Sequence, residues 1–234
     1  MRAPIRFLGI ISLSALAMAT KVAAQVTAEF TPFAGSYRPT ENLVPTGALS
    51  DFYTENVRQQ AGLAFGGRVT AWLTDRLAIE GSYAYLESGT ARTVDEPTCV
   101  NLMSSCGSVT SSTAGHLWMV RAQLLFIVAG RASGTAFYVS GGPTYIGNGD
   151  YEIHYLPTVG ATIARSPGAV GGIGARFKLP GTTFTLRAGV EDCVYVARFS
   201  GYDRGSSWAG SQVQNDVLLS LGLSVHPSDS PSAR

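Results

Sequence analysis

Three histidines are the residues of this chain best suited to acid–base chemistry, and each lies in a different setting. His116 opens an apolar segment, His154 lies in a long polar stretch, and His226 is followed by Pro227 and Ser228. Nucleophilic catalysis needs a Ser, a His and a carboxylate within hydrogen-bond reach. No His-x-Ser pair lies inside an alternating segment, and a solvated tail accounts for His226. We therefore expect no enzymatic activity, no catalytic residue and no cofactor.

The cysteines offer a second kind of chemistry. Cys99 and Cys106 lie close together, within Cys-Val-Asn-Leu-Met-Ser-Ser-Cys. In a chain exported to an oxidising compartment, this pair favours a disulfide that closes a loop, and two free thiols are the alternative. Neither a His nor a second cysteine pair lies beside them, so we expect no metal site. Cys193 is left over, and we expect it to be a buried thiol on the inward side of a strand.

The elements that must position these residues are strands. Several segments alternate apolar and polar side chains with period two, which is the pattern of a strand with two different faces. In the last one, Leu219, Leu221 and Leu223 share one face, opposite Asp216 and Ser220. The predicted strands are residues 27–37, 62–73, 77–86, 118–128, 135–146, 169–179, 184–191 and 216–225.

The connections between these eight strands alternate between long and short. The long ones cover about residues 38–57, 87–115, 147–167 and 196–213, whereas the short ones are turns at 74–76, 129–134 and 180–182. Long connections at one end and short turns at the other are typical of a bacterial outer-membrane barrel, with its long extracellular loops and short periplasmic turns. The fold class predicted is all-β: an eight-stranded antiparallel up-and-down transmembrane barrel.

Composition decides which face of each strand points outward. A soluble ligand-carrying barrel would turn its apolar face inward. Here the polar faces hold mostly small residues with few charges, which would make a poorly soluble exterior but suits a narrow interior. With these faces turned inward, we expect a paired ion network in the lumen. Its predicted members are Arg68, Glu80, Arg121, Arg176, Lys178, Arg187, Glu191 and Asp216.

The N-terminus predicts export. Arg2 and Arg6 precede a short apolar stretch from Phe7 to Ala19, and Val22-Ala23-Ala24 resembles a signal-peptidase site. We therefore expect residues 1–24 to be a cleaved signal peptide, residues 25–226 the barrel, and residues 227–234 a short periplasmic tail. Removal of the signal leaves 14 basic against 16 acidic residues, a net charge of about −2. That balance predicts no nucleic-acid partner.

Residues 25–226 resemble the small outer-membrane β-barrel family, which includes the transmembrane domain of outer-membrane protein A and the outer-membrane protein X and W types. The resemblance rests on Thr31-Pro32-Phe33-Ala34-Gly35, on the stretch from Trp72 to Gly81, and on Leu221-Gly222-Leu223. Members commonly end the last strand with an aromatic residue read by the barrel-insertion machinery, whereas this strand ends Ser224-Val225-His226.

The resemblance implies a non-enzymatic integral protein of the bacterial outer membrane with a structural or surface-interaction role. The expected partners are outer-membrane lipid and lipopolysaccharide, the barrel-insertion machinery, and an extracellular ligand bound through the loops; we expect a monomer. The alternative is a narrow channel or binder for small hydrophobic molecules, which predicts an apolar lumen near the loop end and a lateral opening. A lipid-modifying outer-membrane enzyme is a third interpretation, and it requires His116 or His154 beside a Ser and an acid.

Overall fold

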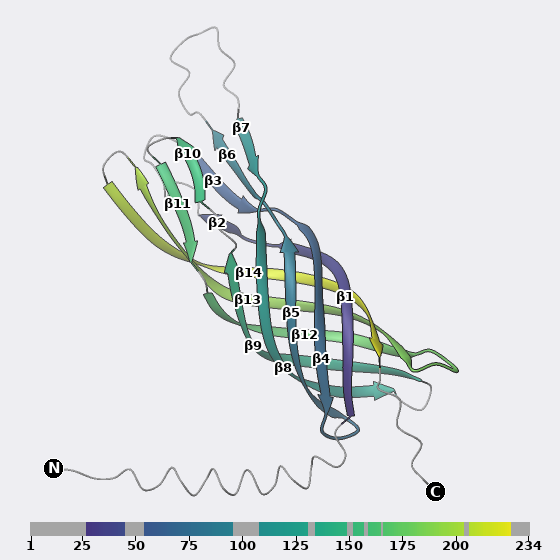
Figure 1. Cartoon of the computed structure of the whole chain (residues 1–234). Coiled ribbons are helices and arrows are strands. Elements are labelled where there is room, and N and C mark those ends of the chain that lie inside the picture. Colours follow the sequence, from purple (N-terminus) through teal and green to yellow (C-terminus); the bar gives the residue numbers. More distant parts are fainter. Residues whose placement is uncertain are drawn as a thin grey trace, which may run out of the picture.

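The alternating segments form long strands that pair antiparallel with their neighbours along the chain. The computed structural model describes residues 27–44, 54–95, 108–130, 134–148, 152–156, 159–164, 166–203 and 206–225. Eight of the described strands build the barrel (Figure 1): β1 (Thr27–Pro39), β4 (Gly62–Trp72), β5 (Leu77–Glu87), β8 (His116–Gly130), β9 (Thr135–Asn148), β12 (Ser166–Lys178), β13 (Phe184–Asp203) and β14 (Ser206–Val225).

Pairing between the first and last strands closes the sheet. The order around the barrel is β14, β1, β4, β5, β8, β9, β12 and β13, and β13 pairs again with β14. Phe30 of β1 is paired with Val225 of β14, and Phe184 of β13 is paired with the same residue. Closure leaves these strands without free edges, so backbone donors and acceptors are paired within the sheet. The predicted fold class is confirmed.

Short turns join the strands at one end, called here the turn end. Between β4 and β5 the Thr74 hydroxyl accepts hydrogen bonds from the backbone N–H groups of Arg76 (3.2 Å) and Leu77 (3.0 Å). Between β12 and β13 a turn contains Gly181 with φ of 72°, a left-handed conformation that favours glycine. Both turns lie where the sequence predicted them.

The opposite end, called the loop end, differs from the prediction, because the four long connections contain strands. They are β2 (Asn42–Val44), β3 (Thr54–Gln59), β6 (Thr90–Asp95), β7 (Ser108–Thr113), β10 (Glu152–Leu156) and β11 (Val159–Ala164), and β13 and β14 extend far beyond their predicted ranges. The strands β2, β3, β6 and β7 form a separate sheet, whereas β10 and β11 add to the upper part of β13. These strands gather beyond the barrel in Figure 1.

Hydrophobic periodicity missed these extensions for a physical reason. The period-two signal arises because one strand face meets lipid and the other the lumen. Beyond the membrane that contrast is lost, and segments such as Thr90–Asp95 and Ser108–Thr113 are rich in Thr, Val and Ser without an apolar face. Their β-branched residues favour strands, but no alternation marks them.

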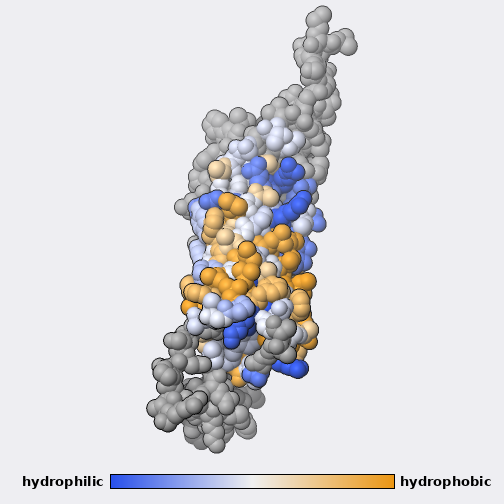
Figure 2. All heavy atoms as spheres, turned by 90° about the vertical axis from the view of Figure 1, so that its right-hand side faces the viewer, coloured by the Kyte–Doolittle hydropathy of each residue, from blue (hydrophilic) through white to orange (hydrophobic). Residues whose placement is uncertain are grey.

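The apolar faces point outward, as predicted. Leu221 of β14 is 56% exposed and Leu124 of β8 is 57% exposed, whereas Leu218 and Leu125 on the inward faces of the same two strands are buried. In the face shown in Figure 2, apolar side chains form a band across the middle, with polar ones above and below it. Among the described residues, no helix is long and apolar enough to cross a membrane.

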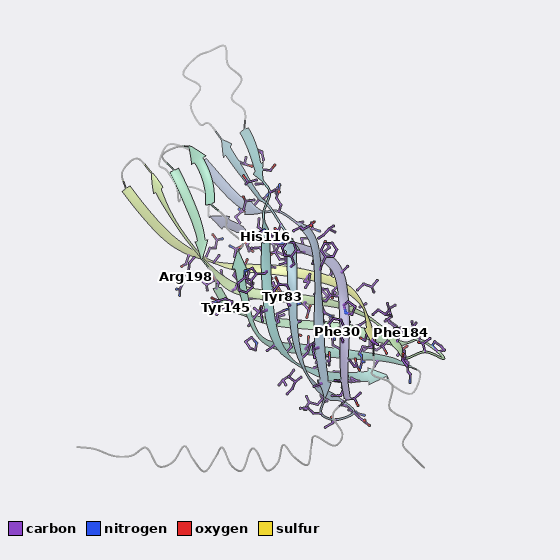
Figure 3. The ribbon with its side chains drawn as sticks, in the orientation of Figure 1. Phe30, Tyr83, His116, Tyr145, Phe184 and Arg198 are labelled. Carbon is purple, nitrogen blue, oxygen red and sulfur yellow. The ribbon has the colours of Figure 1, made fainter. Side chains whose placement is uncertain are left out.

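Aromatic side chains mark both ends of the apolar band. Figure 3 shows Phe30 and Phe184 toward the turn end and Tyr83 and Tyr145 farther toward the loop end, and all four side chains are exposed. This arrangement is typical of the aromatic girdles that lie at the two interfaces of a bilayer. The barrel is therefore built to span a membrane, and its candidate site lies in the enclosed lumen.

Candidate functional site

The lumen is lined by the polar residues of the barrel strands. Period-two alternation turns Arg68 of β4, Arg121 of β8 and Arg187 of β13 inward, where they are 1%, 1% and 2% exposed. Glu80 of β5 and Glu191 of β13 are buried beside them. Charges removed from water in this way require partners, because an unpaired buried charge is strongly destabilising.

Glu80 is held by three groups from two other strands, β4 and β13. Arg187 donates to both of its carboxylate oxygens, with Nη2 at 3.1 Å from Oε1. Thr70 donates its hydroxyl to Oε2 at 2.7 Å. Arg68 Nε lies 3.8 Å from Oε1. The fork-like contact with Arg187 fixes both side chains across the bore, since β5 and β13 lie on opposite walls of the barrel.

Glu191 is linked to Glu80 through Arg68, which contacts both carboxylates. Its Oε2 accepts hydrogen bonds from Arg68 Nη2 at 2.8 Å and Arg121 Nη1 at 2.7 Å, and its Oε1 accepts one from Gln123 Nε2 at 2.9 Å. Arg187, Glu80, Arg68, Glu191 and Arg121 therefore form one series of alternating charges, called here the lumen ion chain. It begins and ends with arginine, so its formal net charge is +1.

Aromatic rings cover the guanidinium groups of the lumen ion chain. The Arg68 guanidinium lies 4.5 Å from the centroid of the Phe33 ring, and that of Arg187 lies 4.7 Å from the Tyr138 ring. Arg187 Nε also donates to the Tyr138 hydroxyl at 2.9 Å. Cation–π contacts of this kind are stronger where water is excluded, so the rings support the chain as well as fill space.

A second ion pair lies toward the turn end. Arg176 Nη2 donates to both oxygens of Glu29, at 2.5 and 2.6 Å, and Trp72 Nε1 donates to Oε1 at 2.6 Å. The Trp72 ring also stacks against Arg176, with 4.6 Å between the guanidinium carbon and the ring centroid. Glu29 was not predicted, because aromatic residues occur on both faces of residues 27–37 and the pattern does not show which face points into the lumen.

Besides Arg176, which pairs with Glu29, two more predicted members of the network lie outside the lumen ion chain, so the prediction of one network is corrected for all three. Lys178 is the last residue of β12, and its side chain is exposed at the turn end, beyond the closed part of the lumen. Asp216 is buried, but its Oδ2 accepts a hydrogen bond from the Tyr37 hydroxyl at 2.5 Å. Among the described residues neither this carboxylate nor the Lys178 ammonium forms an ion pair with the lumen ion chain. Alternation predicts the face of each residue and not its height along the bore.

The lumen becomes apolar toward the loop end. A cluster of buried side chains there includes Leu86, Leu117, Met119, Ile146, Val170 and Leu218, together with Tyr37 and Tyr195. Cys193 belongs to this layer, with its Sγ 3.6 Å from Met119 Sδ, so the prediction of a buried thiol is confirmed. The lumen therefore has an ionic middle and an apolar layer above it.

The other residues suited to chemistry are not assembled into a site in the described part of the chain. The ring of His116 stacks on Tyr85 at 5.3 Å and lies on the exposed face, away from the lumen. No group of three or more metal-ligating side chains occurs among the residues described. Cys99, Cys106, His226 and the side chain of His154 lie outside the described residues.

Comparison with known proteins reveals similarity in fold and not in sequence. No protein-family model matches the chain, and no curated protein sequence matches it. The crystal structure of the outer membrane protein OprG from Pseudomonas aeruginosa is similar, with 13% identity, a TM-score of 0.60, and coverage of 86% of this chain and 97% of OprG.

A second similar structure is that of the outer membrane protein AlkL, determined by solid-state NMR in DMPC lipid bilayers. It shares 15% identity and a TM-score of 0.57, and the alignment covers 89% of this chain and 93% of AlkL. At these identities the likeness concerns the fold alone. Together with the closed sheet and the outward apolar band, it shows that the chain has the fold of the small eight-stranded bacterial outer-membrane β-barrels.

Proposed function

We propose that the protein is a non-enzymatic integral outer-membrane barrel with a structural or surface-interaction role. The observation that carries this proposal is the lumen ion chain, whose five charged side chains bridge the bore between opposite walls. The interior of an eight-stranded barrel is just wide enough for side chains. With the apolar layer packed above the chain, the bore serves to hold the barrel rigid, and interactions with the surroundings take place at the loop end.

The strands beyond the membrane supply the surface for such interactions. The sheet of β2, β3, β6 and β7 and the extension formed by β10, β11, β13 and β14 are long enough to present backbone and side chains outside the lipid headgroups. An extracellular ligand of this protein would be bound there.

Conductance across planar lipid bilayers tests the structural role directly. Purified refolded protein is expected to give no steady conductance steps, because the side chains of the lumen ion chain bridge a bore that is only wide enough for side chains. A porin reconstituted in the same way serves as the positive control. Reproducible steady conductance from the unmodified protein would refute the proposal of a closed, structural bore.

A second candidate function is the binding of small hydrophobic molecules, which two observations favour. The lumen is apolar toward the loop end, around Leu117 and Met119. In addition, backbone pairing does not join β7 to β10 in the described part of the chain, so the two extensions beyond the barrel are separate on that side. Saturable binding of a fluorescent apolar probe that Met119→Gln weakens, and that Glu87→Gln on the exposed face leaves unchanged, would favour this function.

The proposal extends to processing and partners. Residues 1–24 would be removed during export. The barrel-insertion machinery would then recognise a last strand that ends in Val225. Lipopolysaccharide is the expected lipid around the loop-end half of the barrel. Cys99 and Cys106 would form a disulfide in the oxidising environment outside the inner membrane. The intact mass of protein isolated from outer membranes, measured before and after reduction, tests both the cleavage after Ala24 and the disulfide.

A further inference from the structure

Two charged residues lie on the outward face of the barrel near its loop end. Asp192 of β13 and Arg38 of β1 are both paired in register with Val217, which lies on β14 between them. Both charged side chains are exposed. Along β13 the outward neighbours of Asp192 are Val190 and Val194, which are 42% and 43% exposed, so this carboxylate is part of the apolar band.

A charge in this position is costly unless it has a partner. Charged side chains that face lipid destabilise barrels, and an ionisable residue within a membrane marks a functional site by default. No ion pair holds either Arg38 or Asp192 within the described residues. Because the two charges are of opposite sign and lie one strand to either side of β14, the surface centred on β14 is self-complementary.

The same surface also carries a ridge of large apolar side chains beside a groove. Leu219, Leu221 and Leu223 form an exposed ridge along β14. Beside it lies an open apolar groove of about 700 Å³, whose floor includes Ala188 of β13 and Ala175 of β12. Ala188 is paired in register with both Leu221 and Ala175, so ridge and groove run next to each other just below the two charges.

In place of the monomer expected from the sequence, we propose that a second copy of this chain occupies this surface, forming a two-fold symmetric dimer about an axis along the membrane normal close to β14. Such an axis places β1 of one copy opposite β13 of the other. Arg38 of each copy then faces Asp192 of its partner copy, which gives two equivalent ion pairs. The leucine ridges of the two copies then meet at the axis, and the small side chains of Ala175 and Ala188 in the groove beside each ridge allow the barrels to approach closely. Interfaces of this kind are the commonest in homo-oligomers.

The charges favour a second copy over a lipid chain as the occupant. An acyl chain would fill the groove, but it carries no group that could neutralise Asp192 between Val190 and Val194. A pair formed within one chain, across Val217, would neutralise both charges without using the ridge and groove. These two alternatives and the dimer make different predictions for charge reversal.

Energy transfer between donor-labelled and acceptor-labelled copies in lipid vesicles tests the proposal. Unmodified protein is expected to show transfer that rises with protein-to-lipid ratio to a plateau. Arg38→Asp and Asp192→Arg, each studied alone, place like charges at both contacts and are expected to weaken association about tenfold or more. Glu87→Arg on the exposed face of β5, away from β14, is the matched control and is expected to leave the transfer unchanged.

The decisive sample is a mixture of the two single variants. In a mixed dimer, the aspartate introduced at position 38 of one copy faces the arginine introduced at position 192 of the other. At the second contact the unmodified Arg38 and Asp192 face each other, so both ion pairs return. Transfer between the variants is therefore expected to recover to the level of the unmodified protein.

Two outcomes would overturn the proposal. One is that energy transfer does not recover when the two single variants are mixed, which is the result expected if Arg38 and Asp192 pair within one chain. The other is that the unmodified protein shows no energy transfer, which is the result expected if lipid and not a second copy occupies the groove. Heat-modifiable migration on gels confirms that each variant is folded before mixing.

Discussion

Replacement of Glu191 by Gln should strongly destabilise the barrel, although it changes neither the size nor the shape of the side chain much. Glu191 accepts three hydrogen bonds of 2.7–2.9 Å, two of them from arginines, and it is buried. The substitution raises the formal charge of the lumen ion chain from +1 to +2 and places an amide group among donors. Removal of one partner from a buried ion pair costs about 3–5 kcal/mol, and we expect the free energy of unfolding to fall by that amount.

Urea titration of protein folded in lipid vesicles, followed by tryptophan fluorescence, measures this loss. Glu87→Gln removes a carboxylate of the same length from the exposed face of β5 and is expected to change the free energy of unfolding by less than about 0.5 kcal/mol. The double variant Arg121→Gln and Glu191→Gln removes one stranded cation as well, and it should be more stable than Glu191→Gln alone. A loss below about 1 kcal/mol for Glu191→Gln, or a double variant less stable than the single one, would refute the electrostatic reasoning.

Three further predictions concern other parts of the barrel. Tyr37→Phe removes the hydrogen bond to buried Asp216 and should cost about 1.5–3 kcal/mol in the same titration, since the acceptor is charged. Gly174→Ala places a Cβ 2.3 Å from the Tyr138 ring and 2.5 Å from the Ala188 carbonyl oxygen, so it should cost about 1–3 kcal/mol. Gly171→Ala, which meets nothing within 4 Å, should be neutral, and equal effects of the two glycine variants would contradict the packing argument. Leu124→Arg on the lipid-facing surface should cost about 2–4 kcal/mol, and a neutral result would show that the outward face has been misassigned.

Sequence alternation predicted some features of the candidate site and not others. Alternation placed Arg68, Glu80, Arg121, Arg187 and Glu191 on inward faces, and the structure shows them there. The same alternation gave no height along the bore, which is why Lys178 and Asp216 were grouped with them although one is exposed and the other bonds to Tyr37. Glu29 escaped notice because residues 27–37 carry aromatics on both faces.

The sequence by itself determined the eight membrane strands, their turns and, except in residues 27–37, the direction of their faces, because a strand between lipid and lumen must alternate and a tight turn must contain turn-forming residues. The strands beyond the membrane were decided by the tertiary structure, since neither of their faces meets lipid. Closure of the barrel decided the rest: Glu80 and Arg187 lie 107 positions apart on opposite walls, and only the curvature and stagger of the closed sheet bring their side chains together.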